Sequence, residues 1–211
     1  MNLDLWLAFV AAAIVLLAIP GPTILTVISY AASHGRRSAL PLVAGVALGD
    51  STALFLSLVG LGALLATSAL WFNVVKWAGG LYLLWLGIKL LRAGGGTAPT
   101  VAAADAAPES LWRLFANTYV VTALNPKGIV FFVAFLPQFL DPSQPAAGQL
   151  WVLGATFVAL ATLNATLYAV SANAARRMLA SPRAQRRFNL VGGSLICTAG
   201  AWALMARRQV S

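Results

Sequence analysis

The chain has 211 residues, of which 60% are hydrophobic and only 9% are charged, and its mean hydropathy is +0.84. Soluble domains carry about 25% charged residues, so this composition excludes a water-soluble globule and predicts an integral membrane protein. Lys and Arg outnumber Asp and Glu by 14 to 5. Because these basic residues fall in short clusters between apolar segments, we interpret them as a topology signal. We expect a lipid bilayer as their surroundings and no nucleic-acid partner.

Six segments are long and apolar enough to be membrane helices, which need about 20 mostly apolar residues. They cover residues 5–30, 38–64, 69–91, 113–139, 148–173 and 188–207. Five spans, with the first or the last segment not crossing, are the alternative. Residues 93–110 are rich in Gly, Ala and Pro and are typical of a flexible linker. We therefore expect one all-α transmembrane domain over 1–211, with a first half at 1–92 and a second half at 111–211.

The basic residues predict the orientation of these segments. Ten of the fourteen lie in the first, third and fifth connections: Arg36, Arg37, Lys89, Arg92, Arg113, Arg176, Arg177, Arg183, Arg186 and Arg187. Short loops rich in Lys and Arg stay in the cytoplasm, so both termini are expected outside. Arg207 and Arg208, at the outer end of the last segment, run against this rule.

Pro20-Gly21-Pro22 interrupts the first apolar segment. Proline lacks an N–H group and crowds the preceding turn, so the helix must break there. Within a membrane, the freed backbone groups are tolerated only where protein or a water-filled cavity satisfies them. The break therefore favours a binding site, and a kink that only helps packing is the alternative. Asn125-Pro126-Lys127 is a second interruption, in the fourth segment.

The two halves share landmarks in the same order. Pro22 aligns with Pro126 at an offset of 104 residues, and the glycines of the third and sixth segments align at an offset of 113: Gly79-Gly80 and Gly87 with Gly192-Gly193 and Gly200. Three spans in each half force the second half to insert upside down. We therefore expect an inverted 3+3 repeat with broken helices 1 and 4, the plan of many secondary transporters.

Asp50 lies about halfway along the second segment. A carboxylate at that depth is costly and is usually either paired or functional. Gly45, Gly49 and Ala53 have the small-xxx-small spacing that permits close approach of another helix, and Ser57 lies two turns from Asp50 on the same face. We predict that Asp50 binds and releases a proton; an Asp locked in structural hydrogen bonds is the alternative.

Lys127 is the second charge inside an apolar segment. It pairs either with Asp50 or with the carboxylate of a substrate, and snorkelling toward an interface is its alternative role. The Asn125 amide is suited to satisfy backbone groups that the break frees. Further polar side chains at helical spacing are expected to line a cavity, unless they only bond their own backbone: Thr23, Thr26 and Tyr30; Thr118 and Thr122; Asn164, Tyr168 and Ser171.

Other kinds of site have little support. His34 is the only histidine and Cys197 the only cysteine, so neither a nucleophile–base set nor a metal site is expected. The chain has no phosphate-binding glycine loop. We therefore expect no enzyme activity, no cofactor and no bound metal.

Four motifs in this order resemble the LysE/RhtB amino-acid exporter family (LysE family translocators). They are Pro20-Gly21-Pro22, Gly45 with Gly49-Asp50, Leu124-Asn125-Pro126-Lys127 followed by Phe131-Phe132, and Leu136-Pro137-Gln138-Phe139. The resemblance covers nearly the whole chain. It implies export of amino acids or their derivatives across a bacterial cytoplasmic (inner) membrane, driven by an ion gradient. It also implies that Pro20, Gly21, Pro22, Asp50, Asn125, Pro126 and Lys127 are motif positions.

We therefore predict a secondary-active exporter with alternating access, coupled to the proton gradient. The expected substrate and proton pathway comprises Pro20, Gly21, Pro22, Thr23, Asp50, Asn125, Pro126, Lys127 and Asn164. Helix N-terminal N–H groups are expected to hold a substrate carboxylate, and freed carbonyls and Asp50 its ammonium. A metal-cation exporter of a related scaffold and a non-transporting structural or regulatory membrane subunit are the alternatives. Assembly into a homo-oligomer stays open.

Overall fold

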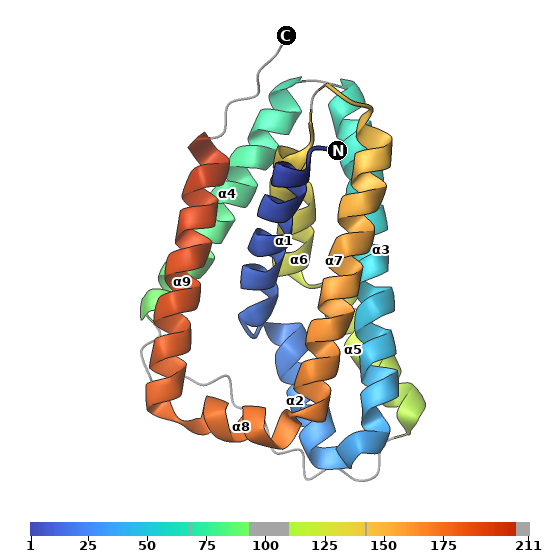
Figure 1. The fold of residues 1–211 in the computed structure, drawn as a ribbon, viewed down its shortest axis with the longest axis vertical. Coiled ribbons are helices and arrows are strands. Elements are labelled where there is room, and N and C mark those ends of the chain that lie inside the picture. Colours follow the sequence, from blue (N-terminus) through green and yellow to red (C-terminus); the bar gives the residue numbers. More distant parts are fainter. Residues whose placement is uncertain (68, 93–109, 142, 206–211) are drawn as a thin grey trace.

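The computed structural model describes residues 1–67, 69–92, 110–141 and 143–205, and the expected linker lies almost wholly outside them. The described residues fold into an elongated bundle of helices (Figure 1). The elements are α1 (Leu3–Ala18), α2 (Pro22–His34), η1 (Gly35–Ser38), α3 (Ala39–Thr67), α4 (Ala69–Arg92), α5 (Leu111–Ala123), α6 (Pro126–Val130), η2 (Phe131–Phe135), η3 (Leu136–Phe139), α7 (Ala146–Val170), α8 (Ala172–Ala180) and α9 (Pro182–Met205).

Three helical stretches within the described residues are long and apolar enough to cross a membrane. They are Pro22–Gly60, Leu111–Phe139 and Ala146–Val170. Leu3–Ala18 is apolar but shorter. The all-helical prediction is therefore consistent with the structure, and the number of six spans stays a prediction.

Both expected helix breaks are present. The first helix ends at Ala18, and α2 begins at Pro22 with the extended Gly21 as its N-cap. In the second half, α5 ends at Ala123 and α6 begins at Pro126. Proline at the first helical position loses nothing, because that N–H has no partner within the helix anyway. The prolines thus end one helix and start the next at both points.

The two broken helices cross the bundle in opposite directions. In Figure 1 the chain runs down through α1 and α2, and it runs up through α5 and α6. At the offset of 104, Thr23 corresponds to Lys127 and Gly21 to Asn125. The Asn125 amide contacts the Thr23 hydroxyl, and the Lys127 stem lies against Gly21. If the two halves are exchanged, Asn125 takes the place of Gly21 and Thr23 takes the place of Lys127, so the first contact becomes the second. This relation supports the inverted repeat that we propose.

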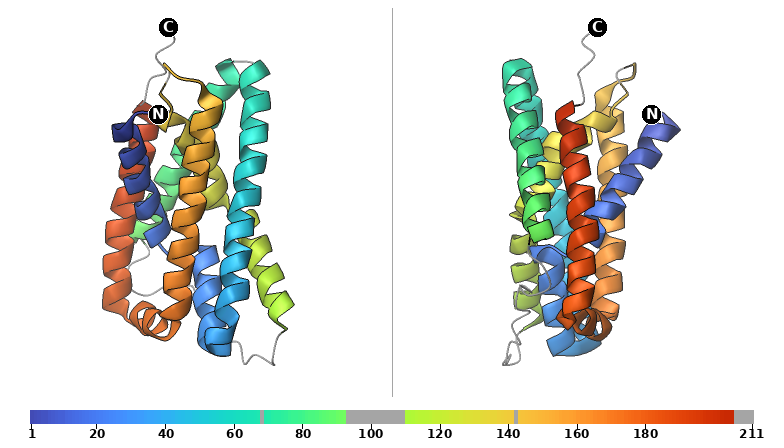
Figure 2. Two further views of the ribbon diagram at one scale, coloured as in Figure 1. Left: turned by 45° about the vertical axis from the view of Figure 1, so that its right-hand side comes forward. Right: turned by 90° about the vertical axis from the view of Figure 1, so that its left-hand side faces the viewer.

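The fifth connection and the end of the fourth segment differ from the predicted helix boundaries. Residues 172–180 form α8, a short helix that lies across one end of the bundle, and α9 starts at Pro182 rather than at 188 (Figures 1 and 2). Beyond α6 the chain does not continue as an α-helix: Phe131–Phe135 forms a π-helical turn and Leu136–Phe139 a 3₁₀ turn. Such turns inside helices often accompany functional sites.

The connection between η3 and α7 is held by side chains. Gln149 accepts from the Asp141 N–H at 2.8 Å and donates to the Asp141 carbonyl at 2.9 Å. The hydroxyl and the N–H of Ser143 both donate to Asp141 Oδ1, and they hold the pKa of that carboxyl below its usual value. The Met1 ammonium donates to Gln144 Oε1 at 2.6 Å, so the N-terminus lies at this end of the bundle.

Candidate functional site

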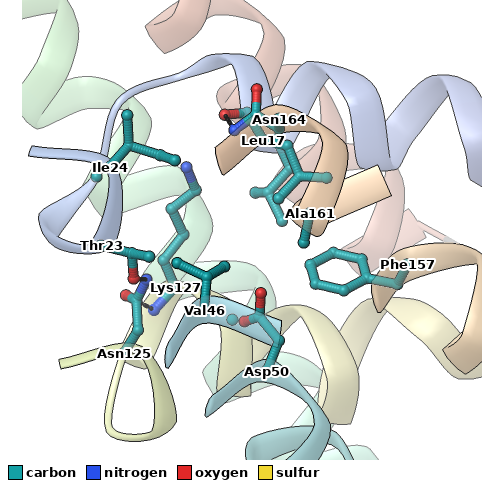
Figure 3. A pocket seen from close by; sticks show the side chains of 13 residues that line it. Leu17, Thr23, Ile24, Val46, Asp50, Asn125, Lys127, Phe157, Ala161 and Asn164 are labelled. Atoms are coloured by element: carbon teal, nitrogen blue, oxygen red, sulfur yellow. Dashed lines mark hydrogen bonds between the residues drawn. The ribbon is translucent and has the colours of Figure 1, made fainter. Parts of the chain in front are cut away.

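A cavity of about 40 Å³ lies where the two helix breaks meet. It is lined by Leu16, Leu17, Gly21, Thr23, Ile24, Val46, Asp50, Asn125, Lys127, Gly128, Phe157, Ala161 and Asn164 (Figure 3). These residues come from α1, α2, α3, α6 and α7 and from the two breaks. The cavity therefore draws on both halves of the chain.

The carboxyl end of α1 is capped by side chains from the second half. Asn164 Nδ2 donates to the Leu17 carbonyl at 3.1 Å, and the Tyr168 hydroxyl donates to the Ala18 carbonyl at 3.1 Å. Lys127 Nζ donates to the Ile19 carbonyl at 2.7 Å. The last carbonyls of a helix have no intrahelical partner, and a cation is favourable at this negative end. The three side chains thus satisfy the backbone groups that the first break frees.

The amino end of α2 faces the same cavity. Its N-cap Gly21 offers no side-chain cap, and Pro22 has no N–H. The first N–H groups of a helix lack intrahelical acceptors, so those of Thr23 and Ile24, two residues that line the cavity, are available to an anion. Helix N-termini of this kind favour negative charge.

Asn125 joins the two breaks. Its Oδ1 accepts from the Lys127 N–H at 3.1 Å and so caps α6, while its Nδ2 donates to Thr23 Oγ1 at 3.1 Å. One amide therefore fixes the start of α6 and its position beside the start of α2. This is the role that the sequence predicted for Asn125, with Thr23 as an added partner.

Asp50 points into the cavity from α3 (Figure 3). Its side chain is 7% exposed, and within the described residues no donor forms a hydrogen bond with its carboxylate. One carboxylate oxygen lies 4.0 Å from the Cβ position at Gly128, so the absence of a side chain there keeps the approach open. A buried carboxylate without a partner is costly. An unpartnered carboxylate of this kind is typical of a group that binds a ligand or a proton.

Lys127 crosses the cavity instead of pairing with Asp50. Its ammonium reaches the Ile19 carbonyl, and no ion pair within 4.0 Å joins it to Asp50 in the described part of the chain. The cavity thus holds an acidic and a basic side chain that are separated from each other. The sequence left open whether these two residues pair, and the structure places them in one cavity without contact.

The other polar residues that the sequence predicted lie outside the lining of the cavity. Thr26 and Ser171 donate to carbonyls of their own helices, those of Pro22 and Leu167, which is the alternative that the sequence allowed. Thr118 and Thr122 do not line the cavity, because they pack against Gly45 and Gly49 on α3. The same is true of the remaining predicted residues: Pro20, Pro22, Tyr30, Ser57, Pro126 and Tyr168.

Sequence reasoning missed the apolar wall of the cavity. Val46 lies one turn before Asp50 on α3, and Ala161 and Phe157 lie one and two turns before Asn164 on α7. Residues three or four positions apart share one face of a helix. The spacing of these residues from the two polar side chains was the signal that could have identified them.

Comparison with known proteins decides the family. The sequence profile of the LysE type translocators matches residues 14–207. The chain belongs to the LysE type translocator family. The homoserine/homoserine lactone efflux protein of Salmonella typhimurium (strain LT2) is 34% identical over 207 residues, 98% of this chain and 99% of the relative.

Two leucine efflux proteins also match. That of Enterobacter sp. (strain 638) is 34% identical over 158 residues, 75% of this chain and 74% of the relative. That of Klebsiella pneumoniae is 28% identical over 192 residues, 90% of this chain and 88% of the relative. No solved structure matches the chain. As a LysE type translocator, the protein is a membrane transporter, and the resemblance predicted from its motifs is confirmed.

Proposed function

We propose that this translocator exports amino acids or their derivatives across the bacterial cytoplasmic membrane by alternating access. The observation that carries the proposal is the cavity between the two helix breaks, where Asp50, Lys127 and the amino end of α2 converge. Broken helices that meet at a site of this kind are the plan of many secondary transporters. Relatives named for the efflux of homoserine, homoserine lactone and leucine support the substrate class.

The two ends of an amino acid match the charges of the cavity. In our proposal the buried Asp50 holds the ammonium group, and the N–H groups of Thr23 and Ile24 hold the carboxylate. The carbonyls at the end of α1 contribute less than the sequence suggested, because Asn164, Tyr168 and Lys127 already bind them.

A neutral side chain fits the rest of the cavity. Its other walls are apolar and come from Leu16, Leu17, Ile24, Val46, Phe157 and Ala161. A basic side chain would bring a further cation beside Lys127 with no carboxylate to receive it. We therefore propose neutral amino acids as the preferred cargo.

The cavity must widen before such a substrate enters. About 40 Å³ is enough for a water molecule, which needs about 10–15 Å³ on this measure. Sites for small organic ligands have volumes of about 300–1,000 Å³. We therefore interpret the structure as a closed form of the transport cycle.

We further propose that Asp50 carries the coupling proton. Its carboxylate is buried, has no hydrogen-bond donor among the described residues and faces the substrate position. A proton and a substrate ammonium then compete for the same carboxylate. Because the two cannot bind together, entry of the proton would drive export of the substrate, which is antiport.

The alternatives from the sequence have less support. A metal-cation exporter needs a group of ligands, and no three His, Cys, Asp or Glu side chains gather within the described residues. A non-transporting subunit would not require two unpaired charges in a shared cavity. Both alternatives also fit the named relatives less well.

Counterflow in proteoliposomes tests the proposal. Purified protein is reconstituted with unlabelled leucine or homoserine inside, and uptake of the labelled amino acid is followed against the same vesicles loaded with lysine. We expect transient accumulation with the neutral amino acids and little with lysine. If no amino acid moves in either direction, the assignment is wrong.

A further inference from the structure

Lys127 does not pair with the Asp50 carboxylate, which would be its strongest partner. We propose that the Ile19 carbonyl is a resting position for the Lys127 ammonium, from which the carboxylate of a zwitterionic substrate draws it away. This inference rests on the proposed function and assigns Lys127 a specific part in it. In the substrate-bound state the zwitterion lies between Asp50 and Lys127 and contacts both.

The resting position is built by both halves of the chain. Lys127 Nζ lies 2.7 Å from the Ile19 carbonyl, at the negative end of α1. Its stem passes over Gly21, where a Cβ would lie 3.5 Å from Lys127 Cδ and 3.7 Å from Nζ. The bare glycine backbone therefore gives the lysine side chain its path across the break.

The separation from Asp50 needs a cause. Opposite charges attract strongly inside a protein because the effective dielectric constant is low. Lysine also has a flexible four-carbon stem that can adopt other positions. The bond to Ile19 provides a competing partner, so Asp50 stays free for an ammonium group and the lysine for a carboxylate.

The resting position lies next to the proposed carboxylate site. Gly21 is the N-cap of α2, and the lysine ammonium lies against it. A carboxylate held by the N–H groups of Thr23 and Ile24 is then within a short side-chain movement of Lys127. Unlike Asn164 and Tyr168, which cap the neighbouring carbonyls, Lys127 ends in an ammonium group, which gains a stronger partner by moving to a carboxylate.

The lysine content makes this movement measurable. The chain has three lysines, Lys76, Lys89 and Lys127. Protein labelled with ¹⁵N-lysine and ¹³C-carbonyl isoleucine is studied in lipid bilayers by solid-state NMR. We expect a dipolar coupling between Lys127 Nζ and an isoleucine carbonyl in the substrate-free protein. Lys127→Arg identifies the signal; if that variant does not fold, Lys76→Arg and Lys89→Arg identify it by elimination.

Two ligands separate the roles of the ammonium and the carboxylate. Leucine has both groups, whereas leucinamide keeps the ammonium and lacks the carboxylate. Saturating leucine should abolish the coupling and shift only the Lys127 resonance, and leucinamide should leave both unchanged while still raising the thermal stability of the protein. A coupling that persists with bound leucine, or that leucinamide abolishes equally, overturns the resting position.

Counterflow measured on the same preparation distinguishes a failure of the proposed resting position from a failure of the proposed export function. Active counterflow with an unmoved Lys127 overturns the resting position and leaves export intact. Absence of the coupling in the substrate-free protein also overturns it, whatever the transport result. Absence of both leucine binding and counterflow contradicts the export of leucine and the inference that depends on it.

Discussion

The polar residues at the helix breaks have two different roles. Asn164 and Tyr168 donate to backbone carbonyls and complete the end of α1. Asp50 has no such bond within the described residues and faces the cavity. Since unsatisfied backbone groups are costly in a membrane, substitution of the capping residues should affect stability first, and substitution of Asp50 should affect transport first.

Tyr168→Phe tests the capping role. The variant keeps the ring and removes the donor to the Ala18 carbonyl, so we expect a loss of about 1 kcal/mol in the free energy of unfolding, typical of one hydrogen bond. Thermal unfolding in detergent and counterflow would both be measured. The matched control is Tyr82→Phe, a tyrosine whose ring contacts Trp85. Equal stability of the two variants, or lost transport with unchanged stability in Tyr168→Phe, would contradict the capping role.

At the residue scale, the sequence predicted which side chains lie at the site better than it predicted which backbone groups they bind. Asp50 and Lys127 were found because a charge is conspicuous in an apolar segment, and Asn125 because it precedes a proline. The carbonyls of Leu17, Ala18 and Ile19 could not be assigned partners in advance. Which side chain reaches them depends on how α7 and α6 pack against α1, and no local pattern contains that information.

Among the elements, α3 and α5 make a contact that places Asp50. A Cβ added at Gly49 would lie 2.7 Å from Thr122 Cβ and 2.9 Å from the Tyr119 carbonyl, and one at Gly45 would lie 2.9 Å from the Phe115 carbonyl. The predicted small-xxx-small face is thus the surface on which the two helices approach. Asp50 follows directly after Gly49, so this contact sets its depth in the cavity.

Gly49→Ala tests that contact. The added methyl group meets backbone and a β-branched side chain, neither of which can move easily, so we expect a loss of about 1–3 kcal/mol in stability and reduced counterflow. Gly60→Ala is the control on the same helix, because nothing lies within 4 Å of its Cβ position. There the substitution should be neutral or stabilise by up to about 1 kcal/mol. Equal thermal unfolding of the two variants would show that the close contact is absent.

The boundaries of the elements show where local patterns fail. The prolines marked both breaks correctly, since their effect on the backbone is local. Residues 172–180 carry Arg176 and Arg177 and were assigned to the end of a span and a loop, yet they form α8. The π-helical turn at Phe131–Phe135 was also unforeseen. In it, the Phe131 ring packs tilted against Phe157 and the Phe132 ring packs edge-on, with ring centroids 5.3 and 4.8 Å apart. This is a tertiary contact that no local pattern contains.

For the whole molecule, the contacts between α4 and α9 also support the proposed inverted repeat. A Cβ at Gly87 would lie 2.8 Å from the Gly193 carbonyl, and one at Gly80 would lie 3.4 Å from the Gly200 carbonyl. At the offset of 113, Gly80 corresponds to Gly193 and Gly87 to Gly200. If the two halves are exchanged, the contact between Gly87 and Gly193 therefore becomes the contact between Gly200 and Gly80. This is expected if a two-fold axis passes between the two helices.

Cysteine labelling tests the orientation that the basic loops predict. Ser143 and Ser33 lie at opposite ends of the bundle and are exposed. In intact cells, an impermeant maleimide should modify Ser143→Cys from outside, and Ser33→Cys only after the membrane is opened. The unmodified chain, with Cys197 alone, gives the background. The reverse labelling pattern would place the arginine-rich end outside and contradict the predicted topology.

Proton-driven efflux tests the central claim most directly. Vesicles loaded with labelled leucine are diluted into medium of the same pH or of a more acidic pH, with wild type, Asp50→Asn and the control Asp141→Asn, whose carboxylate lies outside the cavity. We predict that acidic medium accelerates efflux in wild type and in Asp141→Asn, and that Asp50→Asn loses this response at equal protein levels. Full acceleration by the pH gradient in Asp50→Asn would contradict the account, because the proton would then use another group.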